Sequence, residues 1–65
     1  MYRNYAVTSG RQTVAFREAT TAQEAILDYL RGLGCRPDEL VRMGAEAVAW
    51  RGAVYRAAPA DDRAA

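Results

Sequence analysis

The stretch from Glu46 to Ala57, E-A-V-A-W-R-G-A-V-Y-R-A, decides the fold. Its alanines are compatible with a helix, whereas its β-branched and aromatic residues favour strands. With Arg51-Gly52 as a two-residue turn, the flanking residues align in antiparallel register: Trp50 opposite Ala53, Val48 opposite Tyr55, and Glu46 opposite Ala57. The large side chains of both arms then share one face, because side chains alternate along a strand. The stretch therefore predicts a half-buried hairpin.

The same alternation predicts a second hairpin near the N-terminus. Residues 2–8 and 11–17 flank Ser9-Gly10, where glycine supplies the positive φ of a tight turn. If Thr8 faces Arg11, one face is apolar and collects Tyr5, Val7, Val14 and Phe16. The opposite face is more polar and carries Tyr2, Asn4, Ala6, Thr8, Arg11, Thr13, Ala15 and Arg17.

The segment between the hairpins has helical spacing. Thr21 and Glu24 form the pattern of a capping box. The apolar residues that follow recur at intervals of three and four: Ala22, Ala25, Ile26, Tyr29, Leu30 and Leu33. Gly34 stands where a left-handed C-cap residue belongs. After it, Pro37 and the acidic pair Asp38-Glu39 predict a short second helix of one or two turns that ends at Gly44.

These elements predict a small two-layer α+β domain of ββαββ order, with a four-stranded sheet and one main helix on one face. The expected domain spans residues 1–58, and residues 59–65 are expected to be a flexible C-terminal tail. The expected core contains Tyr5, Val7, Val14, Phe16, Ile26, Tyr29, Leu30, Leu33, Leu40, Val48, Trp50 and Tyr55.

One helix leaves the reverse face of such a sheet bare, which suggests an interaction surface. The expected binding residues on that face are Tyr2, Arg11, Thr13, Arg17, Val54 and Arg56. We expect a non-catalytic protein-interaction or assembly module that acts through this face or a sheet edge, with a homodimer or another protein as the partner. The alternative is a nucleic-acid-binding regulator that uses the arginines of the same face, but the net charge of +1 favours the protein partner.

The composition offers little for catalysis. The chain has no histidine, one cysteine and one serine, Ser9, so we expect no enzyme, no cofactor and no metal site. Cys35 has two interpretations, a thiol activated by Arg36 and the next helix N-terminus, or a packed small residue; the second is favoured. Trp50 and Tyr55 could form a stacking platform, but the hairpin register favours a place in the core.

The cysteine content bears on the cellular compartment. A single cysteine cannot form an internal disulfide, which is typical of a reducing, cytoplasmic setting. No apolar run approaches the ~20 residues that a membrane helix needs, and the N-terminus lacks the pattern of a signal peptide. We therefore expect a cytoplasmic protein with no membrane partner.

Overall fold

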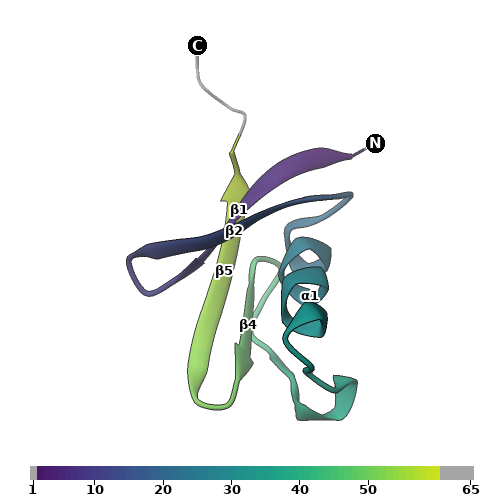
Figure 1. Cartoon of the computed structure of the whole chain (residues 1–65), viewed down its shortest axis with the longest axis vertical. Coiled ribbons are helices and arrows are strands. Elements are labelled where there is room, and N and C mark those ends of the chain that lie inside the picture. The colour runs from purple at the N-terminus through teal and green to yellow at the C-terminus, as the bar shows by residue number, and fades with distance from the viewer. Residues whose placement is uncertain (1, 61–65) are drawn as a thin grey trace.

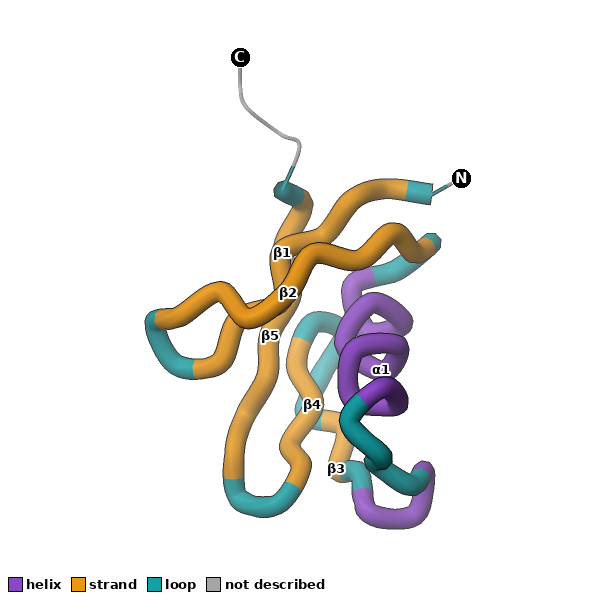
Figure 2. The backbone as a smooth tube through the Cα atoms, in the orientation of Figure 1, coloured by secondary structure: helices purple, strands orange, loops and turns teal. Residues whose placement is uncertain are grey.

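Five strands and one α-helix make up the computed structural model, which describes residues 2–60 (Figure 1). The elements in chain order are β1 (Arg3–Ser9), β2 (Gln12–Ala19), α1 (Ala22–Gly32), a 3-10 turn η1 (Pro37–Glu39), β3 (Val41–Arg42), β4 (Ala47–Trp50) and β5 (Ala53–Pro59). The strands form one antiparallel sheet in the order β2-β1-β5-β4-β3. The two hairpins therefore meet through β1 and β5 within one chain, and α1 packs against one side of the sheet (Figure 2).

The α+β class and the single main helix are confirmed, but the sheet has five strands where the sequence predicts four. The short second helix over 37–43 is only a 3-10 turn. Its last backbone bond runs from the Leu40 N–H to the Pro37 carbonyl, and Leu40 is already extended at φ −91° and ψ 146°. The chain then pairs with β4, Val41 opposite Ala49 and Arg42 opposite Val48. Pairing along a free sheet edge supplies backbone bonds that a second helical turn would otherwise have to make.

The register of the β4–β5 hairpin is confirmed. Trp50 lies opposite Ala53 and Val48 opposite Tyr55, and the Ala57 N–H donates to the Glu46 carbonyl at 3.2 Å. Both turn residues have positive φ, 53° for Arg51 and 82° for Gly52, as a type I′ turn requires. Val48 and Trp50 are buried on the helix side, where Tyr55 packs against them. The stretch quoted first is thus two strands and not a helix.

The register of the β1–β2 hairpin differs from the prediction. Gly10, at φ 64°, is the first residue of the turn, so Ser9 pairs with Gln12. A bulge then shifts the register between Thr8 and Val7, and Val7 pairs with Ala15. One extra residue in β2 reverses the alternation beyond it. Phe16 consequently turns to the uncovered face and is 57% exposed, so its predicted place in the core is wrong.

Helix α1 begins and ends where the sequence predicts. The Thr21 hydroxyl accepts the Glu24 N–H at 3.1 Å, which caps the first turn. At the other end the Cys35 N–H donates to the Leu30 carbonyl and the Gly34 N–H to the Arg31 carbonyl, both at 3.1 Å. With Gly34 at φ 92°, this pair of bonds is a Schellman motif.

The core lies between α1 and the sheet. Its fully buried large side chains are Val7, Ile26, Leu30 and Val48. Of the remaining predicted core residues, Tyr5 and Trp50 are buried, Val14, Tyr29, Leu40 and Tyr55 are half-buried against the cluster, and Leu33 is 52% exposed. Leu33 follows the last helical residue, so it does not share the direction of the stripe. Alanines that the prediction omits complete the core: Ala19, Ala25 and Ala57.

The C-terminal strand extends through Pro59, and the Ala60 N–H donates to the Asn4 carbonyl at 2.8 Å. The rest of the predicted flexible tail, residues 61–65, lies outside the described residues.

Candidate functional site

The candidate site is the sheet face that α1 leaves uncovered, called the open face from here on. Strand alternation and the register assign its residues: Asn4, Ala6, Thr8, Thr13, Phe16, Glu18, Val41, Ala47, Ala49, Val54, Arg56 and Ala58. Apart from Glu18 and Arg56 these side chains carry no charge. The open face is therefore a largely neutral surface with one charge of each sign.

Cross-strand pairing orders the open face into rows. One apolar row contains Phe16, Ala6 and Ala58, and the other contains Val54, Ala49 and Val41. Between them runs a central row of Thr13, Thr8 and Arg56, continued by Ala47, which is buried. Along β5, Val54 and Ala58 are each two residues from Arg56, so the apolar rows are equally spaced about the central one.

Each apolar row ends in a large exposed side chain. Phe16 is 57% exposed at the β2 end, and Val41 is 60% exposed at the β3 end. Neither residue was predicted to belong to the site. Phe16 was missed because no simple sequence signal marks the bulge, and Val41 because it was assigned to a helix. Together they give the open face more apolar surface than its alanines and threonines alone would provide.

The structure brings together only part of the predicted binding set. Thr13, Val54 and Arg56 lie on the open face. Arg11 lies in the turn between β1 and β2, at the rim. Tyr2 is 70% exposed and lines a hollow beside α1 together with Leu27 and Asp28.

Arg17 lies on the opposite side of the sheet, so its predicted place on the open face is wrong. The bulge turns Arg17 toward α1, where its Nε lies 3.2 Å from an Asp28 carboxylate oxygen. Its guanidinium also lies 5.7 Å from the centroid of the Tyr29 ring. The open face thereby loses one of the three arginines assigned to it.

Trp50 places a polar contact at the rim of the core. Its indole Nε1–H donates to Glu39 Oε1 at 3.0 Å, while the ring itself is 7% exposed. This hydrogen bond lowers the pKa of the Glu39 carboxyl below its ordinary value. The bond ties η1 to β4, and the guanidinium of the adjacent residue, Arg51, lies 4.8 Å from the Trp50 ring centroid. Because the ring is buried, Trp50 is not a stacking platform.

Cys35 is a half-buried free thiol. Burial raises its pKa above the ordinary value, the nearby Glu39 carboxylate raises it further, and Arg51 opposes the shift. A raised pKa leaves less thiolate at neutral pH, which is the reverse of an activated nucleophile. The Sγ instead donates weakly to the Arg36 carbonyl at 3.5 Å.

Residues 2–60 offer no support for two other classes of site. No group of three or more His, Cys, Asp or Glu side chains in that range is placed to hold a metal ion. Across the same residues, no helix has the length and apolar character needed to cross a membrane. Comparison of the chain with protein-family models, curated proteins and solved structures finds no match.

Proposed function

We propose that this chain is a small non-catalytic assembly module whose open face packs against the open face of a second copy. The observation that carries the proposal is the pair of apolar rows that end in Phe16 and Val41, exposed at 57% and 60%. Exposed apolar surface of this kind marks contact sites on proteins. A domain of 65 residues also has a thin core, which association supplements.

The arrangement of the rows suits a symmetric partner. A two-fold axis that lies along the central row would exchange the two apolar rows, so that Ala58 of one copy faces Val54 of the other at β5, twice. Small residues within the rows, such as Ala6 and Ala49, allow the two sheets to approach closely. The contact would therefore be self-complementary.

Arg56 distinguishes this proposal from binding to nucleic acid. In the symmetric contact Arg56 of one copy approaches Arg56 of the other, so added salt screens the repulsion and strengthens association. Binding to nucleic acid weakens with salt, because counterions are released on binding. The nucleic-acid alternative also loses Arg17 to Asp28, and the open face carries one carboxylate, Glu18, as well as Arg56.

Sedimentation equilibrium over a range of micromolar concentrations tests the proposal. We expect a monomer–dimer equilibrium for the natural chain, a shift to monomer in Phe16→Glu and Ala49→Glu, and tighter association at high salt. Leu33→Glu is the matched control, because Leu33 is 52% exposed but lies at the end of α1. A strictly monomeric natural chain, or equal weakening by the control, would overturn the assignment.

A further inference from the structure

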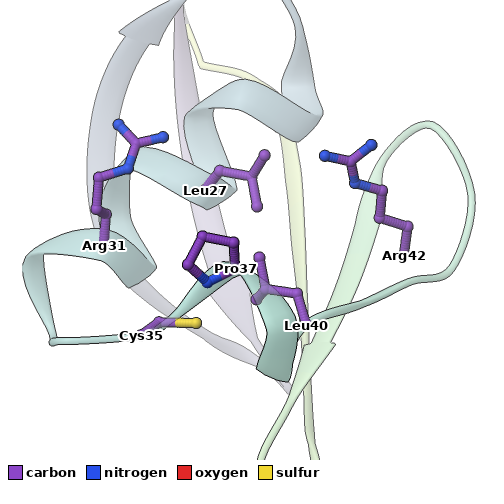
Figure 3. A pocket seen from close by; sticks show the side chains of 6 residues that line it. All are labelled: Leu27, Arg31, Cys35, Pro37, Leu40 and Arg42. Carbon is purple, nitrogen blue, oxygen red and sulfur yellow. The ribbon is translucent and has the colours of Figure 1, made fainter.

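A second feature lies on the helix side of the sheet and does not depend on the open face. A hollow of about 600 Å³ lies between α1 and the segment that leads into β3 (Figure 3). Its lining comes from three parts of the chain: Leu27 and Arg31 of α1, Cys35 and Pro37 of the link and η1, and Leu40 and Arg42 at β3. Its volume falls within the roughly 300–1,000 Å³ that is usual for small-molecule sites.

The chemistry of the hollow divides into two parts. Arg31 and Arg42 stand on opposite sides of it, with Leu27, Pro37 and Leu40 between them (Figure 3). Both arginines are exposed, and within residues 2–60 neither has a carboxylate within ion-pair distance. The hollow therefore combines two positive charges with an apolar floor.

Two acidic groups near these arginines, Asp28 and Glu39, make contacts elsewhere. Asp28, one turn before Arg31 on α1, pairs with Arg17 at 3.2 Å. Glu39, in η1, accepts the Trp50 indole N–H at 3.0 Å. Neither carboxylate compensates the charge of Arg31 or Arg42 by a direct contact, so an anion from solution can approach both.

A neighbouring hollow of about 350 Å³ shows the opposite character. It shares Leu27 and Arg31 with the first, but its rim carries three carboxylates: Glu18, Glu24 and Asp28. These carboxylates repel an anion from that side of Arg31. Arg42 is the one other arginine among the residues that line these two hollows, so a second positive charge supports Arg31 only on the side of the first hollow.

We propose that the hollow between Arg31 and Arg42 binds a small-molecule monocarboxylate with an aliphatic body. One guanidinium takes the carboxylate, whose planar shape fits its paired N–H donors, and the other adds a favourable charge across the hollow. The aliphatic chain lies on Leu27, Pro37 and Leu40, where each buried methylene increases affinity by up to about fourfold. Amines and neutral alcohols of the same length lack the group that the two arginines bind.

Cys35 provides a reporter inside the hollow, because it is the only cysteine of the chain. The experiment measures the alkylation rate of Cys35 at constant pH with increasing octanoate, below micelle-forming concentrations. Hexanoate and decanoate give the dependence on chain length, and octanol and octylammonium are the charge controls. Amide chemical shifts of residues 27–42 provide a second measurement that does not depend on the thiol.

We expect octanoate to slow alkylation with half-protection at about 1 mM or below, decanoate to protect more strongly than hexanoate, and the controls to protect at least tenfold less. Arg31→Gln and Arg42→Gln should each weaken protection about tenfold, whereas Arg11→Gln, at the β1–β2 turn, should leave it unchanged. The proposal is overturned if octanol protects Cys35 as well as octanoate does. It is also overturned if neither substitution changes the protection by octanoate or the amide chemical-shift changes that octanoate causes. Absence of both protection and shift changes up to about 10 mM would also overturn it.

Discussion

Replacement of Phe16 by alanine tests whether β2 contains the bulge. A regular hairpin places Phe16 in the core, whereas the bulge opposite Val7 turns it to the open face at 57% exposure. The two arrangements predict very different losses in the free energy of unfolding for the same substitution. The variant therefore tests the backbone register through a measurement of stability.

The magnitude follows from the covered surface. Complete burial of a phenylalanine side chain contributes about 1.5–3 kcal/mol, and less than half of the Phe16 surface is covered. Phe16→Ala should therefore lower the free energy of unfolding of the monomer by about 1 kcal/mol. Truncation of a phenylalanine in a packed core costs about 3–5 kcal/mol.

Urea unfolding followed by the fluorescence of Trp50, the only tryptophan, measures both the variant and the natural chain. The protein must be dilute enough to be monomeric, because loss of a dimer contact would add to the apparent cost. Leu30→Ala is the reference for a core site, since Leu30 is fully buried and its truncation should cost about 2–5 kcal/mol. If Phe16→Ala lowers the free energy of unfolding of the monomer as much as Leu30→Ala does, the bulge is absent and Phe16 does not belong to the open face.

Four further predictions concern the helix and its surroundings. Gly34→Ala should destabilise by about 1–2 kcal/mol in urea unfolding, because Gly34 has φ 92° although the space around it is open. Gly32→Ala, in α1 and also in open space, should instead stabilise by about 0.5–1 kcal/mol, so a loss there would contradict the helix end described above. Thr21→Ala removes the cap on the Glu24 N–H and should cost about 1 kcal/mol, with Thr21→Ser close to the natural chain. Glu39→Gln tests the lowered pKa of Glu39, which means that the folded state favours the ionised carboxyl. The natural chain should therefore be more stable than the variant at neutral pH. This difference in stability should disappear as the pH falls below the ordinary carboxyl pKa of 4.5. A difference that grows toward acid pH would show that the hydrogen bond to Trp50 has been misassigned.

The β4–β5 hairpin was predictable because a single local feature determines its register. Arg51-Gly52 forms a two-residue turn, and the pairing of Trp50 with Ala53 follows from it without any long-range information. The ends of α1 were predictable for the same reason, since Thr21 and Gly34 act on the turns beside them. Features within a few residues of their cause are those that sequence patterns describe well.

The β1–β2 hairpin required information that its own sequence does not contain. The alternation of Tyr5, Val7, Val14 and Phe16 fits a regular pair of strands, in which these four residues form the more apolar face. The observed register instead places Phe16 on the open face and Ala15, Arg17 and Ala19 on the helix side. Small residues there leave room for α1, which contacts β2 more extensively than it contacts β1. The choice between the two registers is thus made by the packing of a separate element.

The arginine hollow could not be predicted because it depends on β3, which has two residues. Alternation cannot be recognised in so short a strand, and Leu40, Val41 and Met43 read equally well as the apolar side of a helix turn. Arg42 pairs with Val48, and this pairing directs Arg42 to the side of the sheet that α1 covers. There it lines the same hollow as Arg31. The same pairing sends Val41 to the open face. The two residues of β3 therefore supply one residue to each site: Arg42 to the hollow and Val41 to the open face. A substitution that detaches β3 from β4 should weaken carboxylate binding and self-association together. Arg42→Gln should weaken carboxylate binding alone.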